Sequence, residues 1–150
     1  DERTGGGEAG HLHRCAHRLV GLLGGAEELQ VGAVHAGEIH APALRGIALA
    51  RRAATGANRI VTSPVEHHAV LHTAEDLRDH YGFAVTLAPV DAQGRVDLEG
   101  FAAALGDGSD VAVASILYAN NEVGTIQPMA ALAELCRIRA VPLHTEKEAG

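Results

Sequence analysis

Residues 111–128, VAVASILYANNEVGTIQP, contain the pattern that decides the fold of this chain. The first part, residues 111–117, is an almost uninterrupted apolar run, which is typical of a strand covered on both faces. Such strands occur in parallel sheets that have helices packed on each side. Ligands of open parallel sheets bind beyond the carboxyl ends of the strands. We therefore expect chemistry first in residues 118–128, where two asparagines, a glutamate and a glycine follow the strand.

The composition predicts a single folded domain that binds neither nucleic acid nor membrane. Hydrophobic residues make up 47% of the 150 residues, while aromatic residues make up only 3%, so the core must be built from Ala, Val, Leu and Ile. The net charge of −7 argues against a nucleic-acid surface, which needs a basic stripe. No apolar run approaches the roughly 20 residues of a membrane span, and the start of the chain has no apolar signal core.

The cysteines and histidines favour neither a disulfide framework nor a metal site. Cys15 and Cys136 are the only cysteines, and both fall within apolar patterns of helical spacing. We therefore expect free thiols in a reducing cytoplasm. Ten histidines is an unusual number, but no carboxylate or cysteine recurs around them at ligand spacing, so we expect surface histidines and no metal.

Helical and strand patterns alternate along the chain after a Gly-rich, loose N-terminal end at residues 1–10. Apolar spacing predicts helices over residues 11–23, 42–54, 64–81, 98–105 and 129–138. Apolar or β-branched runs predict strands at residues 29–34, 60–62, 83–87, 111–117 and 140–144. Asp97 is the expected N-cap of the fourth helix. Ser63 and Glu66 have the spacing of a capping box that opens the third. This alternation predicts one domain, a three-layer α/β sandwich with a mostly parallel sheet and crossover helices.

Polar residues just past the predicted strands are the candidate site residues, and each has an ordinary alternative. His67 could stack on a planar ligand or transfer a proton, or it could lie in a solvated first helical turn. Backbone amides around Gly37 and Glu38 could bind a phosphate at a helix start, or form a simple turn. Asn121 could contact a ligand or serve as a turn residue. Glu146 could pair with a protonated ring nitrogen, or belong to a charged tail.

Three stretches together resemble the cysteine desulfurase family of fold-type I pyridoxal-phosphate enzymes (aminotransferase class V). They are residues 59–70 (RIVTSPVEHHAV), 118–128 (YANNEVGTIQP) and 141–145 (VPLHT), and their order and spacing match as well. Members of the family run to several hundred residues. The resemblance therefore implies that residues 11–150 are a fragment of the large cofactor domain, truncated before the Schiff-base lysine.

The resemblance also implies an activity and a set of site residues. The family binds pyridoxal 5'-phosphate and removes sulfur from L-cysteine, giving alanine and an enzyme persulfide, as a cytoplasmic homodimer. His67 matches the histidine that stacks on the pyridine ring, and Asn121 matches the asparagine that hydrogen-bonds the ring 3-hydroxyl. Gly37 and Glu38 stand at the family's Thr-Glu pair, of which the Thr binds the phosphate. Glu146 stands at the aspartate that keeps the pyridine nitrogen protonated.

Departures from the family pattern leave open whether this chain is itself an enzyme. The only lysine is Lys147, which is not at the position of the Schiff-base lysine, and neither Cys15 nor Cys136 matches the persulfide-forming cysteine. We expect the chain alone to be inactive. The alternative is a non-catalytic remnant or partner-binding domain of the same fold. An unrelated nucleotide-binding module is disfavoured, because no Gly-rich fingerprint is present.

Overall fold

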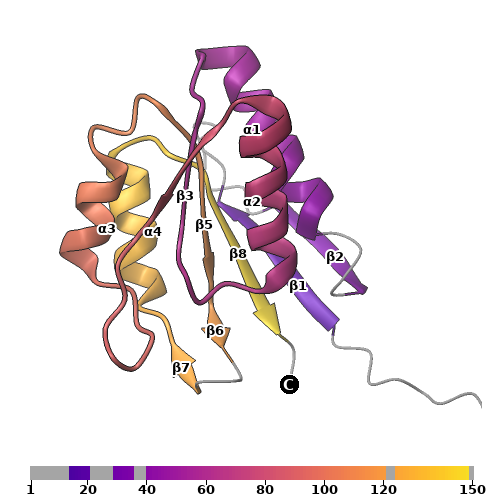
Figure 1. The fold of residues 1–150 in the computed structure, drawn as a ribbon. Helices are drawn as coiled ribbons and strands as arrows, with labels where there is room; N and C mark the ends of the chain where they lie inside the picture. Colours follow the sequence, from indigo (N-terminus) through magenta and orange to yellow (C-terminus); the bar gives the residue numbers. More distant parts are fainter. Residues whose placement is uncertain (1–13, 21–28, 36–39, 121–123, 149–150) are drawn as a thin grey trace, which may run out of the picture.

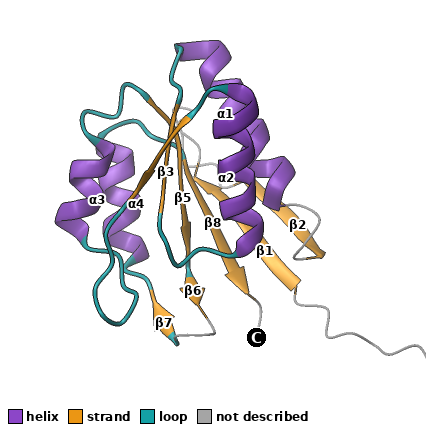
Figure 2. Cartoon of the chain, in the orientation of Figure 1, coloured by secondary structure: helices purple, strands orange, loops and turns teal. Residues whose placement is uncertain are grey.

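The computed structural model describes residues 14–20, 29–35, 40–120 and 124–148. Over these residues, helices lie on both faces of a six-stranded sheet with the order β2-β1-β8-β5-β3-β4 (Figures 1 and 2). Its strands are β1 (Arg14–Val20), β2 (Leu29–His35), β3 (Arg59–Thr62), β4 (Ala84–Leu87), β5 (Val111–Leu117) and β8 (Leu143–Glu148). The helices are α1 (His40–Thr55), α2 (His68–Tyr81), α3 (Leu98–Leu105) and α4 (Met129–Ile138). A separate two-stranded ribbon joins β6 (Ala119–Asn120) to β7 (Thr125–Ile126). The predicted three-layer α/β sandwich is confirmed.

The sheet is parallel from β8 through β5 and β3 to β4, and antiparallel where β1 meets β8 and β2. Every residue of β5 is buried, as the apolar run of residues 111–117 predicts. The four strands of the parallel part are joined by α2, α3 and α4 as crossover helices. This connectivity is what brings the carboxyl ends of β3, β5 and β8 to one edge of the sheet.

Two hydrophobic clusters, one on each face of the sheet, hold the layers together. Leu44 of α1, and Val70 and Leu77 of α2, pack with β3 and β5 on one face. Phe101 and Leu105 of α3 pack with Leu132 of α4 on the other. Burial of each such Leu or Phe side chain stabilises the fold by about 1.5–3 kcal/mol. Apart from Cys136, the buried side chains of the two clusters are aliphatic or phenylalanine, in keeping with the low aromatic content.

The helix predicted over residues 11–23 is wrong, because Arg14–Val20 forms strand β1. Its backbone pairs with β8 on one side and with β2 on the other. Without β1, the backbone N–H and C=O groups of β8 on the side away from β5 would lack this pairing within the sheet. The energy of this ladder outweighs a helical spacing of apolar residues, which is only a local preference. Cys15 therefore lies in a strand and not in a helix.

The last strand begins at Leu143, three residues later than the sequence predicts. Ala140 has a positive φ of 55° in the turn after α4, and Pro142 has no N–H to donate to a ladder. The carbonyl of Pro142 still accepts a hydrogen bond from Ala114 N at 2.9 Å. β8 therefore begins at Leu143, the first residue after Pro142 with a backbone N–H to donate.

Of the two predicted helix caps, one is confirmed and one is wrong. Asp97 caps α3, since its Oδ2 accepts a hydrogen bond from Gly100 N at 2.8 Å. The N-cap of α2 is His67, whose Nδ1 accepts from Ala69 N at 3.1 Å. Ser63 and Glu66 do not form a capping box, because the Glu66 carboxylate bonds the Ser63 hydroxyl and the backbone of β5.

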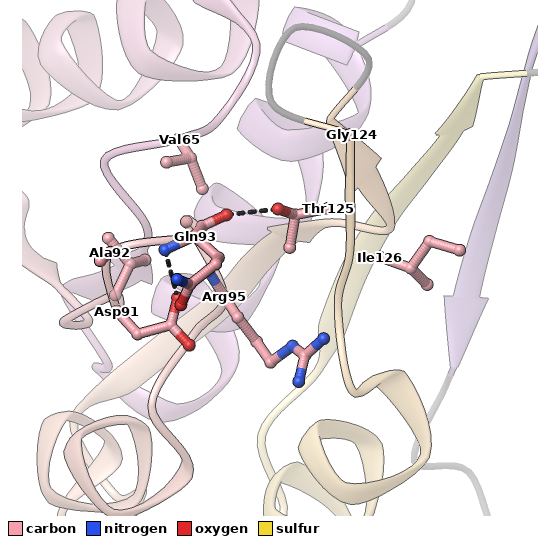
Figure 3. Close-up of a pocket in the computed structure, with 10 residues that line it drawn as sticks. Val65, Asp91, Ala92, Gln93, Arg95, Gly124, Thr125 and Ile126 are labelled. Carbon is pink, nitrogen blue, oxygen red and sulfur yellow. Dashed lines mark hydrogen bonds between the residues drawn. The ribbon is translucent and has the colours of Figure 1, made fainter.

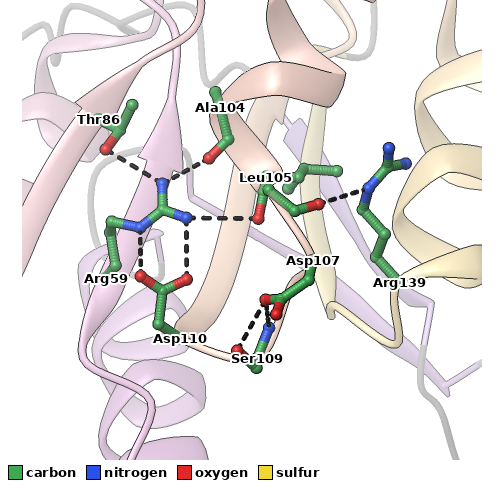
Figure 4. Close-up of polar contacts among 9 residues, drawn as sticks. Arg59, Thr86, Ala104, Leu105, Asp107, Ser109, Asp110 and Arg139 are labelled. Carbon is green, nitrogen blue, oxygen red and sulfur yellow. Dashed lines mark hydrogen bonds and ion pairs between the residues drawn. The ribbon is translucent and has the colours of Figure 1, made fainter.

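Arg59, at the amino end of β3, organises the edge of the sheet opposite those carboxyl ends (Figure 4). Its Nε and Nη2 donate to the two carboxylate oxygens of Asp110, each at 2.9 Å. The same guanidinium donates to the Thr86 hydroxyl of β4 and to the carbonyls of Ala104 and Leu105 at the end of α3. One side chain thereby joins β3, β4, α3 and the turn that enters β5.

Candidate functional site

The candidate site lies where the connections of the sheet diverge. From β3 the chain runs outward to β4 and then returns to β5, which lies on the other side of β3. Helix α2, which follows β3, packs with α1 on one face, whereas α4, which follows β5, packs with α3 on the other (Figure 1). The chain therefore leaves the carboxyl ends of β3 and β5 in opposite directions. In open α/β sheets this switch point is where ligands bind.

The tip of β3 presents His67. Thr62, the last residue of β3, donates its hydroxyl to the Ser115 carbonyl of β5 at 2.9 Å. Glu66 is only 7% exposed, and its Oε1 accepts hydrogen bonds from Ser63 Oγ at 2.7 Å and Leu117 N at 2.9 Å. These contacts place the turn after β3 against the end of β5, with His67 as the next residue.

The His67 ring is exposed and has a defined orientation. Because Nδ1 accepts the Ala69 amide hydrogen, that nitrogen carries no proton, and the neutral ring carries its proton on Nε2. The ring meets His68 edge-on, with 6.3 Å between the ring centroids. An exposed imidazole held in this way at the switch point can stack on a flat ligand or hydrogen-bond to it.

The tip of β5 leads into the ribbon of β6 and β7. The backbone of Ala119 pairs with Ile126, and that of Asn120 pairs with Thr125. At the base of this ribbon, Gln127 N donates a hydrogen bond to the Tyr118 carbonyl at 2.9 Å. Asn121 lies in the connection between the two short strands, outside the described residues. The ribbon therefore brings the two ends of the segment that contains Asn121 to the end of β5.

Gln127 is a structural residue of this edge that the sequence did not single out. It is 4% exposed, and its Oε1 accepts from Val96 N at 2.8 Å while its Nε2 donates to the Gly94 carbonyl at 2.9 Å. Thr125 adds a hydrogen bond from its hydroxyl to the Gln93 carbonyl. The only sequence signal for this role is an amide side chain in the short segment before a helix, because its partners lie more than thirty positions away.

An open groove of about 810 Å³ runs along the turn at residues 91–96, to which Gln127 and Thr125 are hydrogen-bonded (Figure 3). It is lined by Val65, Val90, Asp91, Ala92, Gln93, Gly94, Arg95, Gly124, Thr125 and Ile126. The Asp91 carboxylate is engaged by the backbone amides of Gln93 and Arg95, each at 2.9 Å. Val65 is two residues from His67, so the groove adjoins the tip of β3.

The end of β8 lies beside the end of β5. The backbone of Glu146 pairs in register with Leu117, and Lys147 pairs with Ala16 of β1. Two residues earlier, the buried His144 ring bonds Ser115 Oγ through Nδ1 at 2.8 Å. The structure thus brings together the tip of β3 with His67, the start of the segment that contains Asn121, and the backbone of Glu146. Gly37 and Glu38 lie outside the described residues.

The described side chains contain no activated thiol and no group of three metal ligands. Cys136 lies in α4 at 2% exposure, and burial raises the pKa of its thiol from 9.0 to about 12. Among the described residues, no three His, Cys, Asp or Glu side chains are placed to hold a metal ion. Within the same residues, no helix has the length and apolar character needed to cross a bilayer.

The fold defines a class of protein, an α/β domain whose candidate site lies at its switch point. Residues 39–146 match the family model described as aminotransferase class-V, and the chain belongs to this family. It is 42% identical over 104 residues to "Cysteine desulfurase IscS" of Clostridium botulinum (strain Kyoto / Type A2), a match that covers 69% of this chain and 25% of that protein. It is 41% identical over 137 residues to "Cysteine desulfurase IscS" of Methanosarcina thermophila, covering 91% of this chain and 33% of that protein.

A solved structure described as "SspA in complex with cysteine" is similar in fold as well as sequence. It is 25% identical, has a TM-score of 0.65, and the match covers 87% of this chain and 32% of that chain. The present chain thus spans about a quarter to a third of the length of the curated relatives.

Cysteine desulfurases of this family depend on pyridoxal phosphate, and the residues present fit that cofactor in part. An exposed imidazole at the tip of β3 and an acidic residue on the neighbouring end of β8 suit a flat ring with a basic nitrogen. The only lysine of the 150 residues, Lys147, directly follows Glu146 in β8.

Proposed function

We propose that this chain is the part of a pyridoxal-phosphate-dependent cysteine desulfurase that forms one wall of its cofactor site. The full-length protein would take sulfur from L-cysteine, leaving alanine and a persulfide on the enzyme. The observation that carries the proposal is the meeting of the β3, β5 and β8 ends at the switch point, within the residues that match the family. The names of the two relatives and the cysteine complex of the solved structure support the substrate.

Each candidate residue has a proposed task in that site. His67 would stack on the pyridine ring, with its plane held by the Ala69 amide. Asn121 would donate to the ring hydroxyl, and Glu146 would keep the ring nitrogen protonated. The backbone of Gly37, with Glu38 beside it, would meet the phosphate. When bound, the cofactor supplies an electron sink for the α-carbon of the substrate.

The proposal is tested on the full-length protein, by alanine formation from L-cysteine. We expect His67→Ala and Asn121→Ala each to lower the rate about ten-fold or more, the effect of losing one positioned contact. His80→Ala is the control, because that ring pairs with Asp76 at the far end of α2. Full activity in both site variants would contradict the proposed roles.

The 150-residue chain alone should be inactive, because it has neither the family's lysine nor its reactive cysteine. Incubated with pyridoxal phosphate and L-cysteine, it should form no more alanine than the free cofactor does. Alanine above that background would show that another group replaces the lysine. Saturable but non-covalent binding of the cofactor, without turnover, would instead support the alternative of a non-catalytic domain of the same fold.

We also propose that the protein is cytoplasmic and pairs with a second copy of itself. The free thiol of Cys136 is in keeping with a reducing compartment. Large apolar side chains stay exposed at the carboxyl edge of the sheet, Leu87 at 53% and Ile126 at 60%. Such side chains are often covered in an assembly. Light scattering of the purified full-length protein measures its mass, and a monomer at micromolar concentration would contradict the pairing.

A further inference from the structure

Glu66 is a buried carboxylate placed between the two halves of the candidate site. It precedes His67 in the turn after β3, and its side chain reaches across to the last residue of β5. That residue, Leu117, is followed directly by the segment that leads to Asn121. One side chain thus connects the turn that presents His67 to the strand end that presents Asn121.

The contacts of Glu66 connect the turn after β3 to the end of β5 and do not cap a helix. A capping glutamate would bond the backbone amide of the N-cap residue and affect only the stability of α2. Glu66 Oε1 instead accepts from Leu117 N, 51 positions along the chain, and from the Ser63 hydroxyl of its own turn. Glu66 is only 7% exposed. Removal of its carboxylate would therefore leave the buried Leu117 amide without this acceptor.

We propose that Glu66 is a positioning residue that sets the placement of His67 relative to the end of β5. The proposal rests on the proposed function for its purpose, since the placement of His67 relative to β5 matters only if His67 and Asn121 contact the same ligand. Its physical content concerns the chain itself. When the carboxylate is lost, the turn after β3 moves away from β5, and the His67 ring loses the fixed orientation given by the Ala69 amide.

Hydrogen exchange of single amides, measured by NMR on the 150-residue chain, tests this directly. In Glu66→Ala we expect the amides of Leu117 and Ala69 to exchange about ten-fold faster, the scale expected for losing one buried hydrogen bond. The Phe101 amide, bonded to the Asp97 carbonyl on the other face of the sheet, serves as internal reference and should not change. Glu66→Gln keeps an acceptor oxygen of the same reach, so both amides should stay within about two-fold of the original chain.

Two further variants keep the test decisive. Glu75→Ala removes an exposed glutamate from α2 and should leave all three amides unchanged. Ser63→Ala removes only the hydroxyl that orients the carboxylate, and should accelerate both Leu117 and Ala69 about three-fold. If Glu66→Ala does not fold, the Gln and Ser63 variants decide the question between them.

Three results would overturn the proposal. Acceleration of Leu117 with Ala69 unchanged would mean that the Glu66 contact exists but does not place His67. Equal acceleration of Phe101 would mean a general loss of stability. A Gln variant that behaves like the Ala variant would mean that the acceptor is not what matters. Because no cofactor is added, these outcomes are independent of whether the full-length protein is a desulfurase.

Discussion

Gly108 combines a positive φ with packing that opposes any larger side chain. It has a φ of +82°, and a Cβ there would lie 2.4 Å from the Arg139 carbonyl oxygen. Gly56 has a similar φ of +77° but nothing within 4 Å of such a Cβ. Gly56→Ala therefore reports the backbone cost alone, about 1–2 kcal/mol of unfolding free energy. We expect Gly108→Ala to cost about 1–3 kcal/mol more, because the turn must also shift to remove the overlap.

Urea unfolding of the two glycine variants measures this difference. Equal losses in the two would mean that the turn before β5 moves freely enough to admit a methyl group.

Cys136 should be an inert thiol in the folded chain. Its folded pKa of about 12 lies above the ordinary 9.0, so ionisation favours the unfolded state. The stabilisation from the buried thiol is full below pH 9.0, the unfolded value, and is lost as the pH rises toward 12. In a Cys15→Ala background, a thiol reagent at neutral pH should label Cys136 only in denaturant.

A second measurement follows the same thiol through pH. Between pH 9.0 and 12, the unfolding free energy of the Cys15→Ala chain should fall more steeply than that of Cys15→Ala/Cys136→Ala. Rapid labelling of the native chain would show that α4 opens locally.

At the scale of elements, the Arg59 side chain connects several strands and helices by hydrogen bonds. It joins β3 to Asp110, to β4 and to the last carbonyls of α3. We expect Arg59→Ala to lower the unfolding free energy by about 3 kcal/mol, since several partly buried acceptors lose a charged donor at once. Arg78→Ala is the matched control, because its ion pair with Asp79 is exposed and should contribute almost nothing.

The Arg59 contact also has a predictable pH dependence. The hydrogen bond from Arg59 lowers the pKa of the Asp110 carboxyl. Its stabilisation is therefore present above the unfolded pKa of about 4 and is lost as the pH falls through the lower folded value. In acid, the difference in unfolding free energy between the original chain and Arg59→Ala should shrink. A constant difference would assign the effect to the helix carbonyls alone.

At the scale of the whole molecule, β1 and β2 complete the sheet on the side of β8. A chain consisting of residues 39–150 would leave β8 as an unpaired edge next to the buried β5. Such an edge is a template for pairing with another chain. We expect this shorter chain to self-associate at concentrations where the 150-residue chain does not, as measured by light scattering. A stable monomer would mean that β1 is dispensable.

The elements that could be predicted from sequence are those decided by near neighbours. The strand at residues 111–117 was evident because apolar residues on both faces need cover on both faces. Asp97 was evident as a cap because its bond to Gly100 N spans three residues. The segment Arg14–Val20 was predicted wrongly because β8, its partner in the structure, lies over a hundred positions away.

The candidate site divides in the same way. His67 could be picked out as a polar residue after a strand, since that needs only the local pattern. Glu66 was assigned to a helix cap, because the partner that defines it, Leu117, is 51 positions along the chain. Gln127 carried no functional signal, because its amide is used by backbone groups of residues 94 and 96.

By itself the sequence determined the alternation of strands and helices after residue 28, the buried β5, and the family to which residues 39–146 belong. Apolar periodicity, caps and short motifs are local properties, so they can be read along the chain. Only the tertiary structure decided that β1 pairs with the edge of β8, and that Glu66 connects the turn before His67 to the end of β5 by a hydrogen bond. Both depend on backbone groups distant in sequence finding partners when buried, and that requirement acts only once the layers are packed.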